Sequence, residues 1–486
     1  MNFSEEFSNI LAQSNIAIYT LAKTTGIDRR AIYRLKDGTK KPTFEEFSKI
    51  VKALSLTKET ADRLWRAYEI SSVGEEKFYS REKTKEFLET LSSIYDSKNE
   101  NVVMLTKSEI DITEEFTTLQ GKTNINNFIR NIMSLENATN GFMYIQSDLS
   151  FDFIFDELLF QISYNRSLET KIFISLKSPE KTAEKNFYTD SILSISKIYP
   201  LLLIGENLEA KYVKVTSNSN ALFPYNIITS HYLISISQDK KCAIITKDNK
   251  IIQSTKQIFC DVFPNGKNFV TRLNLDESIL HILDSLFKQN KAKSVTLYSM
   301  DYEPCVTVLS DQSILESSIN KKNPKAVKLI EMYSAIYSQN HVNLISHFTL
   351  DGLRSFLNTG ILFGIPKDYY TPLNEELRIR IIKNMCGAYK KGVYTPHLIN
   401  SANFTFPKNF RYSGSGTIYD YFFITLTDKD DMFNTLSLNE SGLSMHFYDF
   451  VQSLPETNLV FSTEESMQII VDETEKILNC KLDFEK

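Results

Sequence analysis

The stretch Leu21–Leu56, LAKTTGIDRRAIYRLKDGTKKPTFEEFSKIVKALSL, decides the fold of the N-terminal part of the chain. Gly26 predicts a tight turn between two short helices, because glycine readily takes the left-handed conformation that such a turn requires. Asp28 follows as a helix N-cap, and Ile32 and Leu35 lie three residues apart on the side that should be buried. The stretch therefore predicts a second helix that ends at Gly26 and a third helix over Arg29–Lys36.

The flanking residues extend this pattern in both directions. Gly38 stops the third helix, and a Thr43-x-x-Glu46 capping box after Pro42 opens a fourth. A helix near Glu5–Gln13 comes first, and Thr57 opens a fifth, in which Trp65 is expected in the core. The sequence thus predicts an all-α domain of five helices over residues 1–70.

Charge separates this part from the rest of the chain. Residues 1–70 contain 12 Lys/Arg and 9 Asp/Glu, a net charge of +3, so the remaining residues carry −8 of the total of −5. Between Lys23 and Lys41 there are seven bases and two acids. Such a cluster suits binding to phosphate, although charge alone favours a solvated basic face.

Leu21–Leu56 resembles the helix-turn-helix of lambda-repressor-like (Cro/CI, XRE-type) DNA-binding domains in its Leu-Ala pair, Gly26, Ile27, Ile32 and Gly38. The resemblance implies that the third helix enters the major groove of double-stranded DNA. It places base-edge contacts at Arg29, Arg30 and Arg34, with Tyr33 beside them, and backbone contacts at Thr39, Lys40 and Lys41. Arginine donates two hydrogen bonds to guanine, so a G-containing half-site is expected.

Two positions depart from the family pattern. Ala17 stands where a Ser or Asn N-cap is usual, and Ile18 stands where a DNA-contacting Gln is common. A helix-turn-helix that serves as a scaffold or docks another protein is therefore a second interpretation. Tyr33 also has two interpretations, since it either reads a base or covers the apolar stems of its neighbours.

The remainder predicts a large C-terminal α/β region of mixed α+β character, so that the chain is multidomain. We expect a linker helix in residues 71–99, an α/β lobe with a β-meander in 100–270 and a second α/β lobe in 271–486. The meander is expected from the short alternating runs HYLISIS, CAIIT and KIIQS, between His231 and Ser254.

No familiar catalytic motif occurs in this remainder. Phosphate-binding loops, nucleophile elbows, His-Glu-x-x-His and phospholipase-type His-x-Lys spacing are all absent from the sequence. His341 and His347 flank an expected strand, but no third ligand at suitable spacing completes a metal site. Tyr412–Thr417 is expected to be a loop that either wraps an anion or has no ligand. We expect no enzyme activity, no catalytic residues, no cofactor and no metal.

Composition also indicates where in the cell the protein is located. The five cysteines are odd in number and form no Cys-x-x-Cys pair, which argues against a disulfide framework or a zinc site. Apolar stretches such as Ile198–Ile204 fall short of the ~20 residues that span a bilayer, and the N-terminus has no signal-peptide pattern. A cytoplasmic protein without membrane association is expected.

Together these features predict a sequence-specific transcriptional regulator of repressor type. We expect a homodimer that places two recognition helices roughly 34 Å apart on DNA. Its C-terminal region would sense a small-molecule, peptide or protein effector or mediate oligomerisation. The alternative is an enzyme or toxin-like effector whose helix-turn-helix regulates its own gene.

Overall fold

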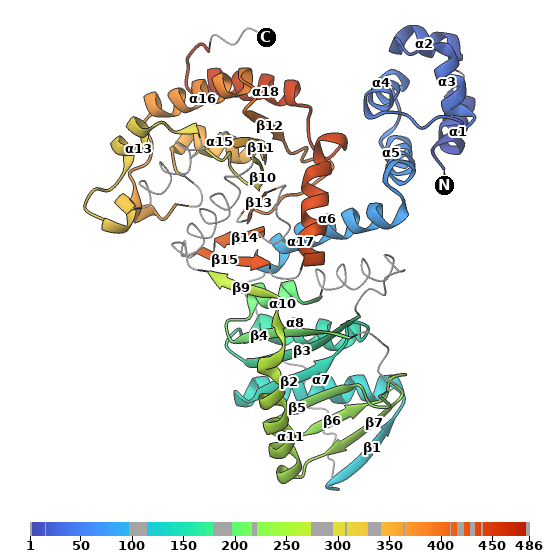
Figure 1. The fold of residues 1–486 in the computed structure, drawn as a ribbon, viewed down its shortest axis with the longest axis vertical. Coiled ribbons are helices and arrows are strands. Elements are labelled where there is room, and N and C mark those ends of the chain that lie inside the picture. The colour runs from blue at the N-terminus through green and yellow to red at the C-terminus, as the bar shows by residue number, and fades with distance from the viewer. Residues whose placement is uncertain are drawn as a thin grey trace.

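The computed structural model describes residues 2–482, apart from residues 15, 97–113, 178–196, 216–220, 274–294, 307–308, 329–341, 363–364, 409, 416–421, 428–432 and 439–440. Within these residues it shows a small helical N-terminal domain and a large C-terminal region with two mixed β-sheets (Figure 1).

The N-terminal domain consists of α1 (Phe3–Ser14), α2 (Ile18–Thr25), α3 (Arg29–Lys36), α4 (Phe44–Leu54) and α5 (Lys58–Val73). Its core has completely buried side chains from four of these helices, including Phe7, Ile32, Phe47 and Leu64. Trp65 packs on this core, with its ring centroid 4.6 Å from that of Phe47, but is only half-buried. One side of Trp65 is therefore left for contacts outside the domain.

Helix α6 (Glu75–Asp96) leads from the N-terminal domain to the second sheet (Figure 1). Gly74 separates it from α5, with φ +87°. Phe87 and Leu88 are buried in a cluster with Phe447 and Phe450 of the C-terminal region. The helix expected as a linker thus contributes to the core of the distant second lobe.

The first sheet has eight strands in the order β1-β7-β6-β5-β2-β3-β4-β8, with parallel pairing only between β2, β3 and β4. Helices α7, α8 and α10 cover one face, and α11 covers part of the other. The elements are β1 (Phe116–Gln120), α7 (Lys122–Thr139), β2 (Phe142–Ser147), α8 (Asp152–Tyr164), β3 (Glu169–Lys177), α10 (Tyr199–Ile204), β4 (Leu208–Val215), β5 (Tyr225–Thr229), β6 (Leu233–Ile236), β7 (Cys242–Thr246), α11 (Asn249–Val262), η1 (Phe263–Asn265) and β8 (Lys267–Asn268).

The second sheet has seven strands in the order β12-β11-β10-β13-β14-β15-β9, and β10, β11 and β12 are parallel. Helices α6 and α17 pack on one face, and α15, α16 and α18 pack on the other. The elements are β9 (Val270–Leu273), β10 (Val295–Asp301), α13 (Gln312–Ser318), β11 (Val342–Phe348), α15 (Leu350–Thr359), η3 (Lys367–Tyr369), α16 (Glu375–Lys390), β12 (Tyr394–Leu398), β13 (Phe410–Ser415), β14 (Phe422–Thr427), β15 (Phe433–Leu438), α17 (Ser441–Ser453), η4 (Leu454–Glu456) and α18 (Thr463–Ile477).

Two expectations about local structure are wrong. The run KIIQS belongs to α11, which Asp248 caps by accepting a hydrogen bond from the Lys250 N–H, so the meander contains β5, β6 and β7 without it. Residues 412–415, expected in a loop, lie in strand β13, whereas residues 416 and 417 are outside the described part. In both segments, pairing and packing with distant residues decide the conformation.

Candidate nucleic-acid interface

The turn between α2 and α3 has the predicted geometry. Gly26 has φ +70°, and its N–H donates to the carbonyl oxygen of Ala22 at 2.9 Å. Ile27 is buried directly after the turn. The left-handed glycine thus ends α2 and directs α3 across it, as predicted from the sequence.

Asp28 fixes the start of α3. Its Oδ1 accepts hydrogen bonds from the N–H groups of Arg30 and Ala31, at 2.9 and 3.2 Å. Ile32 and Leu35 are completely buried on the inner side of the helix. This confirms the predicted N-cap and the predicted buried face, and the opposite face of α3 is consequently turned to solvent.

The exposed face of α3 presents the residues predicted to contact bases. Arg29, Arg30, Tyr33 and Arg34 are all exposed. The guanidinium of Arg29 lies 5.7 Å from the ring centroid of Tyr33, whose side chain is 41% accessible. Tyr33 therefore supports the Arg29 side chain by a cation–π contact, and part of the Tyr33 side chain stays exposed.

The loop after α3 is held more firmly than expected. Gly38 has φ +73°, so this position needs glycine for its backbone conformation, and an added Cβ would also press on the Ser4 hydroxyl at 2.9 Å. The Thr39 hydroxyl and the Lys40 N–H both donate to the carbonyl of Arg34, at 3.3 and 3.0 Å. The loop is thus folded back on the end of α3.

The two loop lysines have partners inside the domain. Lys40 forms an ion pair with Glu46, the capping-box residue of α4, while the Lys41 Nζ donates to the carbonyl of Ser71 at 2.5 Å. Burial raises the pKa of Glu46, but Lys40 and the Thr43 N–H outweigh it and hold the pKa below its ordinary value. Each ammonium group thus has one partner inside the domain and further N–H donors that can meet a phosphate.

Tyr19 is a further exposed aromatic residue of the helix-turn-helix, and it was not singled out from the sequence. It lies in the first turn of α2, and its side chain is 66% accessible. Ala17 before it supplies no side-chain cap to α2, consistent with the departure from the family pattern. The exposure of Tyr19 could have been predicted from the sequence, because Ile18, Leu21 and Ala22 mark the inner face of α2 and position 19 lies on the outer face.

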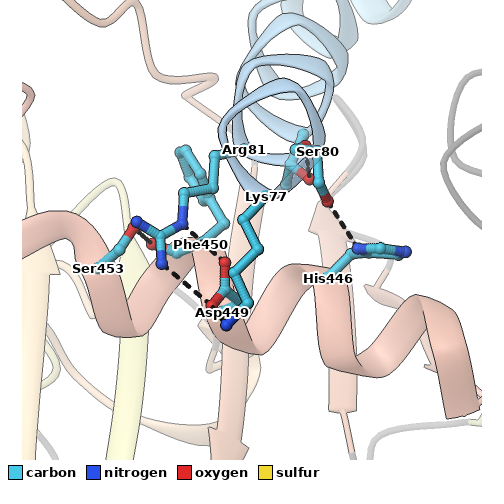
Figure 2. Close-up of polar contacts among 8 residues, drawn as sticks. Lys77, Ser80, Arg81, His446, Asp449, Phe450 and Ser453 are labelled. Atoms are coloured by element: carbon cyan, nitrogen blue, oxygen red, sulfur yellow. Dashed lines mark hydrogen bonds and ion pairs between the residues drawn. The ribbon is translucent and has the colours of Figure 1, made fainter. Parts of the chain in front are cut away.

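Polar contacts fix α6 on the C-terminal region (Figure 2). Arg81 donates from Nε and Nη2 to the two carboxylate oxygens of Asp449 at 2.7 and 3.0 Å, and Lys77 lies 3.4 Å from the same carboxylate. The Ser80 Oγ hydrogen-bonds with His446 Nδ1 at 2.6 Å. These contacts determine where α6 leaves the second lobe and hence where the N-terminal domain lies.

The N-terminal domain also contacts the C-terminal region directly. Lys52 of α4 lies 3.3 Å from the Glu465 carboxylate, and Lys58 of α5 donates to the carbonyl of Ala402 at 3.1 Å. Helix α3 makes neither contact and lies on the outer side of the N-terminal domain in Figure 1. The exposed face of α3 is therefore accessible in this arrangement.

Histidines of the second sheet meet in a way that the sequence did not predict. The register of β11 and β12 sets His347 opposite His397, with their rings 5.4 Å apart and nearly parallel. Burial lowers the pKa of His347 to about 3 and lowers that of His397. His341, considered with His347 as a metal pair but not favoured by the sequence, lies outside the described residues. In the described part of the chain, His, Cys, Asp and Glu form no group of three suited to a metal.

Comparison with known proteins agrees with the geometry of the N-terminal domain. Residues 6–61 match the family model of the Cro/C1-type helix-turn-helix DNA-binding domain. No curated protein matches the chain. Across the described helices, none is long and apolar enough to cross a membrane.

Three solved structures show distant similarity to this chain. An archaeal chromatin protein, whose structure is described as showing a novel mode of DNA binding, is 12% identical with a TM-score of 0.24, over 55% of this chain and 99% of that one. Polyphosphate kinase from Porphyromonas gingivalis is 9% identical with a TM-score of 0.21, over 74% and 56%. Phosphatidylserine synthase from Haemophilus influenzae is 10% identical with a TM-score of 0.24, over 75% and 91%.

Proposed function

We propose, from the premise that residues 6–61 form a Cro/C1-type helix-turn-helix DNA-binding domain, that this protein is a sequence-specific transcriptional regulator. The observation that carries the proposal is the outer face of α3, where Arg29, Arg30 and Arg34 are exposed around Tyr33. Asp28 and Gly26 hold the helix that presents these side chains. A helix so exposed can enter the major groove of double-stranded DNA.

The residues divide into two roles in this proposal. Arg30 and Arg34 reach base edges and favour guanine, because a guanidinium donates two hydrogen bonds to O6 and N7. Thr39, Lys40 and Lys41 grip the phosphate backbone from the loop after α3, where the lysines have further N–H donors for phosphate. The first role provides specificity, and the second provides salt-dependent affinity.

The proposal extends to the whole chain. A homodimer acting as a cytoplasmic repressor places two copies of α3 roughly 34 Å apart on one face of DNA. The C-terminal region then serves assembly or the sensing of an effector. This role of the C-terminal region is supported by the docking of α6 on α17 through Arg81 and Asp449. A change in the second lobe at this contact would move the N-terminal domain.

Binding of the purified full chain to genomic fragments, followed by footprinting at fixed salt, tests the DNA-binding role. We expect a discrete footprint for the wild type and its loss in Arg30→Ala and Arg34→Ala. Each variant should bind the selected site about tenfold more weakly or worse, since a bidentate arginine–guanine contact contributes about 1–3 kcal/mol of discrimination.

The control variant is Lys83→Ala, which removes an exposed cation of α6 that pairs with Glu86. It should leave the footprint unchanged. Arginine variants that footprint like the wild type would refute base reading by α3, and a wild type without any footprint would refute the proposed function.

A further inference from the structure

A cavity of about 360 Å³ lies where the N-terminal domain meets the C-terminal region. Its walls include Trp65 and Glu69 from α5, Phe78 and Glu82 from α6, and Asn458 from the C-terminal region. We call it the joint cavity. Its volume falls in the range of small-molecule sites, which form preferentially at domain interfaces.

The cations that line the joint cavity already have partners inside the protein. Arg81 is bound to Asp449 through two hydrogen bonds, and Lys85 lies 3.2 Å from the Glu89 carboxylate. Lys58 donates a hydrogen bond to the Ala402 carbonyl. The Arg66 guanidinium lies 5.4 Å from the centroid of the Phe78 ring and also contacts the ring and the hydroxyl of Tyr79. Of these cations only Arg81 and Lys85 are paired with a carboxylate, so the unpaired charges of the described lining are Lys58 and Arg66 against three acids, Asp62, Glu69 and Glu82.

The two glutamates are in the opposite situation. Among the described residues, neither Glu69 nor Glu82 forms a hydrogen bond or an ion pair. Burial and the nearby Glu82 raise the pKa of Glu69 to about 7, and Arg81 offsets only part of this rise. Burial also raises the pKa of Glu82, despite the attraction of Lys85 and Arg66. With the pairs of Arg81 and Lys85 set aside, the unpaired carboxylates of the described lining outnumber its cations by one, and Glu69 and Glu82 repel each other.

We propose that the joint cavity binds a small organic cation, with its amine or guanidinium between Glu69 and Glu82 and its apolar part against Trp65 and Phe78. A cation supplies the charge that the carboxylates lack and donates charge-assisted hydrogen bonds to them. The two aromatic side chains offer apolar contact and cation–π attraction. An organic cation also uses the aromatic side chains of the lining, which offer no oxygen ligand to a metal ion.

The position of the cavity gives the ligand a regulatory role. Its walls come from α5 of the N-terminal domain, from α6 and from the C-terminal region, so a bound cation favours the arrangement in which these walls are correctly spaced. The ligand would thereby change the orientation of α3 and the affinity for DNA. This regulatory part of the inference rests on the proposed DNA-binding function, whereas the binding site itself does not.

Trp65 is the only tryptophan of the chain, so its fluorescence reports directly on the joint cavity. The full chain is titrated with benzylamine, an aromatic cation, and with benzyl alcohol, a neutral molecule of similar shape, at constant ionic strength. We expect a saturable fluorescence change with benzylamine and none with benzyl alcohol over the same range. In Glu69→Gln and Glu82→Gln the benzylamine affinity should fall at least fivefold.

Glu76→Gln is the matched control, because it removes the same charge from an exposed position on α6 that does not line the cavity. It should bind benzylamine like the wild type. Thermal melting checks the fold of each variant. Where a glutamine variant does not fold, Glu69→Asp or Glu82→Asp at the same position replaces it, because aspartate keeps the charge but shortens the side chain. Equal responses to both probes, or unchanged benzylamine affinity in the cavity variants, would overturn the site.

The regulatory part is measured separately, as the affinity for the footprinted DNA site with and without saturating benzylamine. A change of threefold or more that disappears in Glu82→Gln would support it. Unchanged DNA affinity with benzylamine bound would overturn the regulation alone. A protein that binds benzylamine but gives no footprint at all would overturn the DNA-binding function and leave the cation site intact.

Discussion

At the scale of single residues, Asp28 determines how well α3 is formed. Its carboxylate satisfies two N–H groups at the start of an eight-residue helix, which has few hydrogen bonds of its own. We expect Asp28→Ala to lower the free energy of unfolding of the N-terminal domain by about 1 kcal/mol. Urea denaturation followed by circular dichroism measures the change.

Asp37 provides the control for this prediction. It caps the other end of α3, where a negative charge opposes the helix dipole, so Asp37→Ala should be neutral or slightly stabilising. Equal losses in the two variants would show that charge, and not the N-cap, explains the effect of Asp28.

At the scale of elements, the contact of α6 with α17 connects the two parts of the molecule. Burial alone would raise the pKa of Asp449, but Arg81 and Lys77 hold it below its ordinary value. We expect Asp449→Ala to destabilise the docked helix by about 2 kcal/mol, since Arg81 is then left half-buried without a counter-charge. Urea denaturation, monitored by Trp65 fluorescence, measures the loss.

A double-mutant cycle separates the ion pair from other effects of the substitution. Arg81→Met combined with Asp449→Ala should cost less than the sum of the single changes, because the partners contact each other. Lys83→Ala, on the exposed side of α6, removes an exposed ion pair with Glu86 and should change the free energy of unfolding by less than about 0.5 kcal/mol. Additive effects of Arg81→Met and Asp449→Ala would contradict a direct coupling.

At the scale of the whole molecule, buried histidines predict loss of stability in acid. Burial lowers the pKa of His446 to about 4 from an ordinary value of 6.5, and also lowers those of His347 and His397. The unfolded chain therefore binds more protons below pH 6.5, and stability is lost as the pH falls toward the folded values. His446 alone accounts for roughly 2 kcal/mol between pH 7 and pH 5.

Urea denaturation at several pH values checks this prediction. His446→Gln should make the loss between pH 7 and pH 5 smaller than in the wild type. Glu69 acts in the opposite sense, because its pKa is raised to about 7 and the folded chain holds its proton more tightly than the unfolded chain. A wild type whose stability is constant or increases on acidification would contradict the dominance of the histidines.

Local features of the N-terminal domain could be predicted because their partners lie close in sequence. Gly26 ends α2 four residues after Ala22, Asp28 caps residues two and three positions later, and Thr43 and Glu46 cap each other. These choices depend on backbone conformation and on short-range hydrogen bonds. The exposed face of α3 follows from the same periodicity, so the candidate base-reading residues were identifiable without a structure.

The sequence by itself thus determined a helix-turn-helix with a basic outer face, because each of its signals lies within a few residues. Tertiary structure alone decided what depends on distant partners: the ring stacking of His347 on His397, the salt bridge from Arg81 to Asp449 and the cavity between α5, α6 and the C-terminal region. It also decided that KIIQS is helical, since short apolar runs fit a strand or a helix equally well until their neighbours are known.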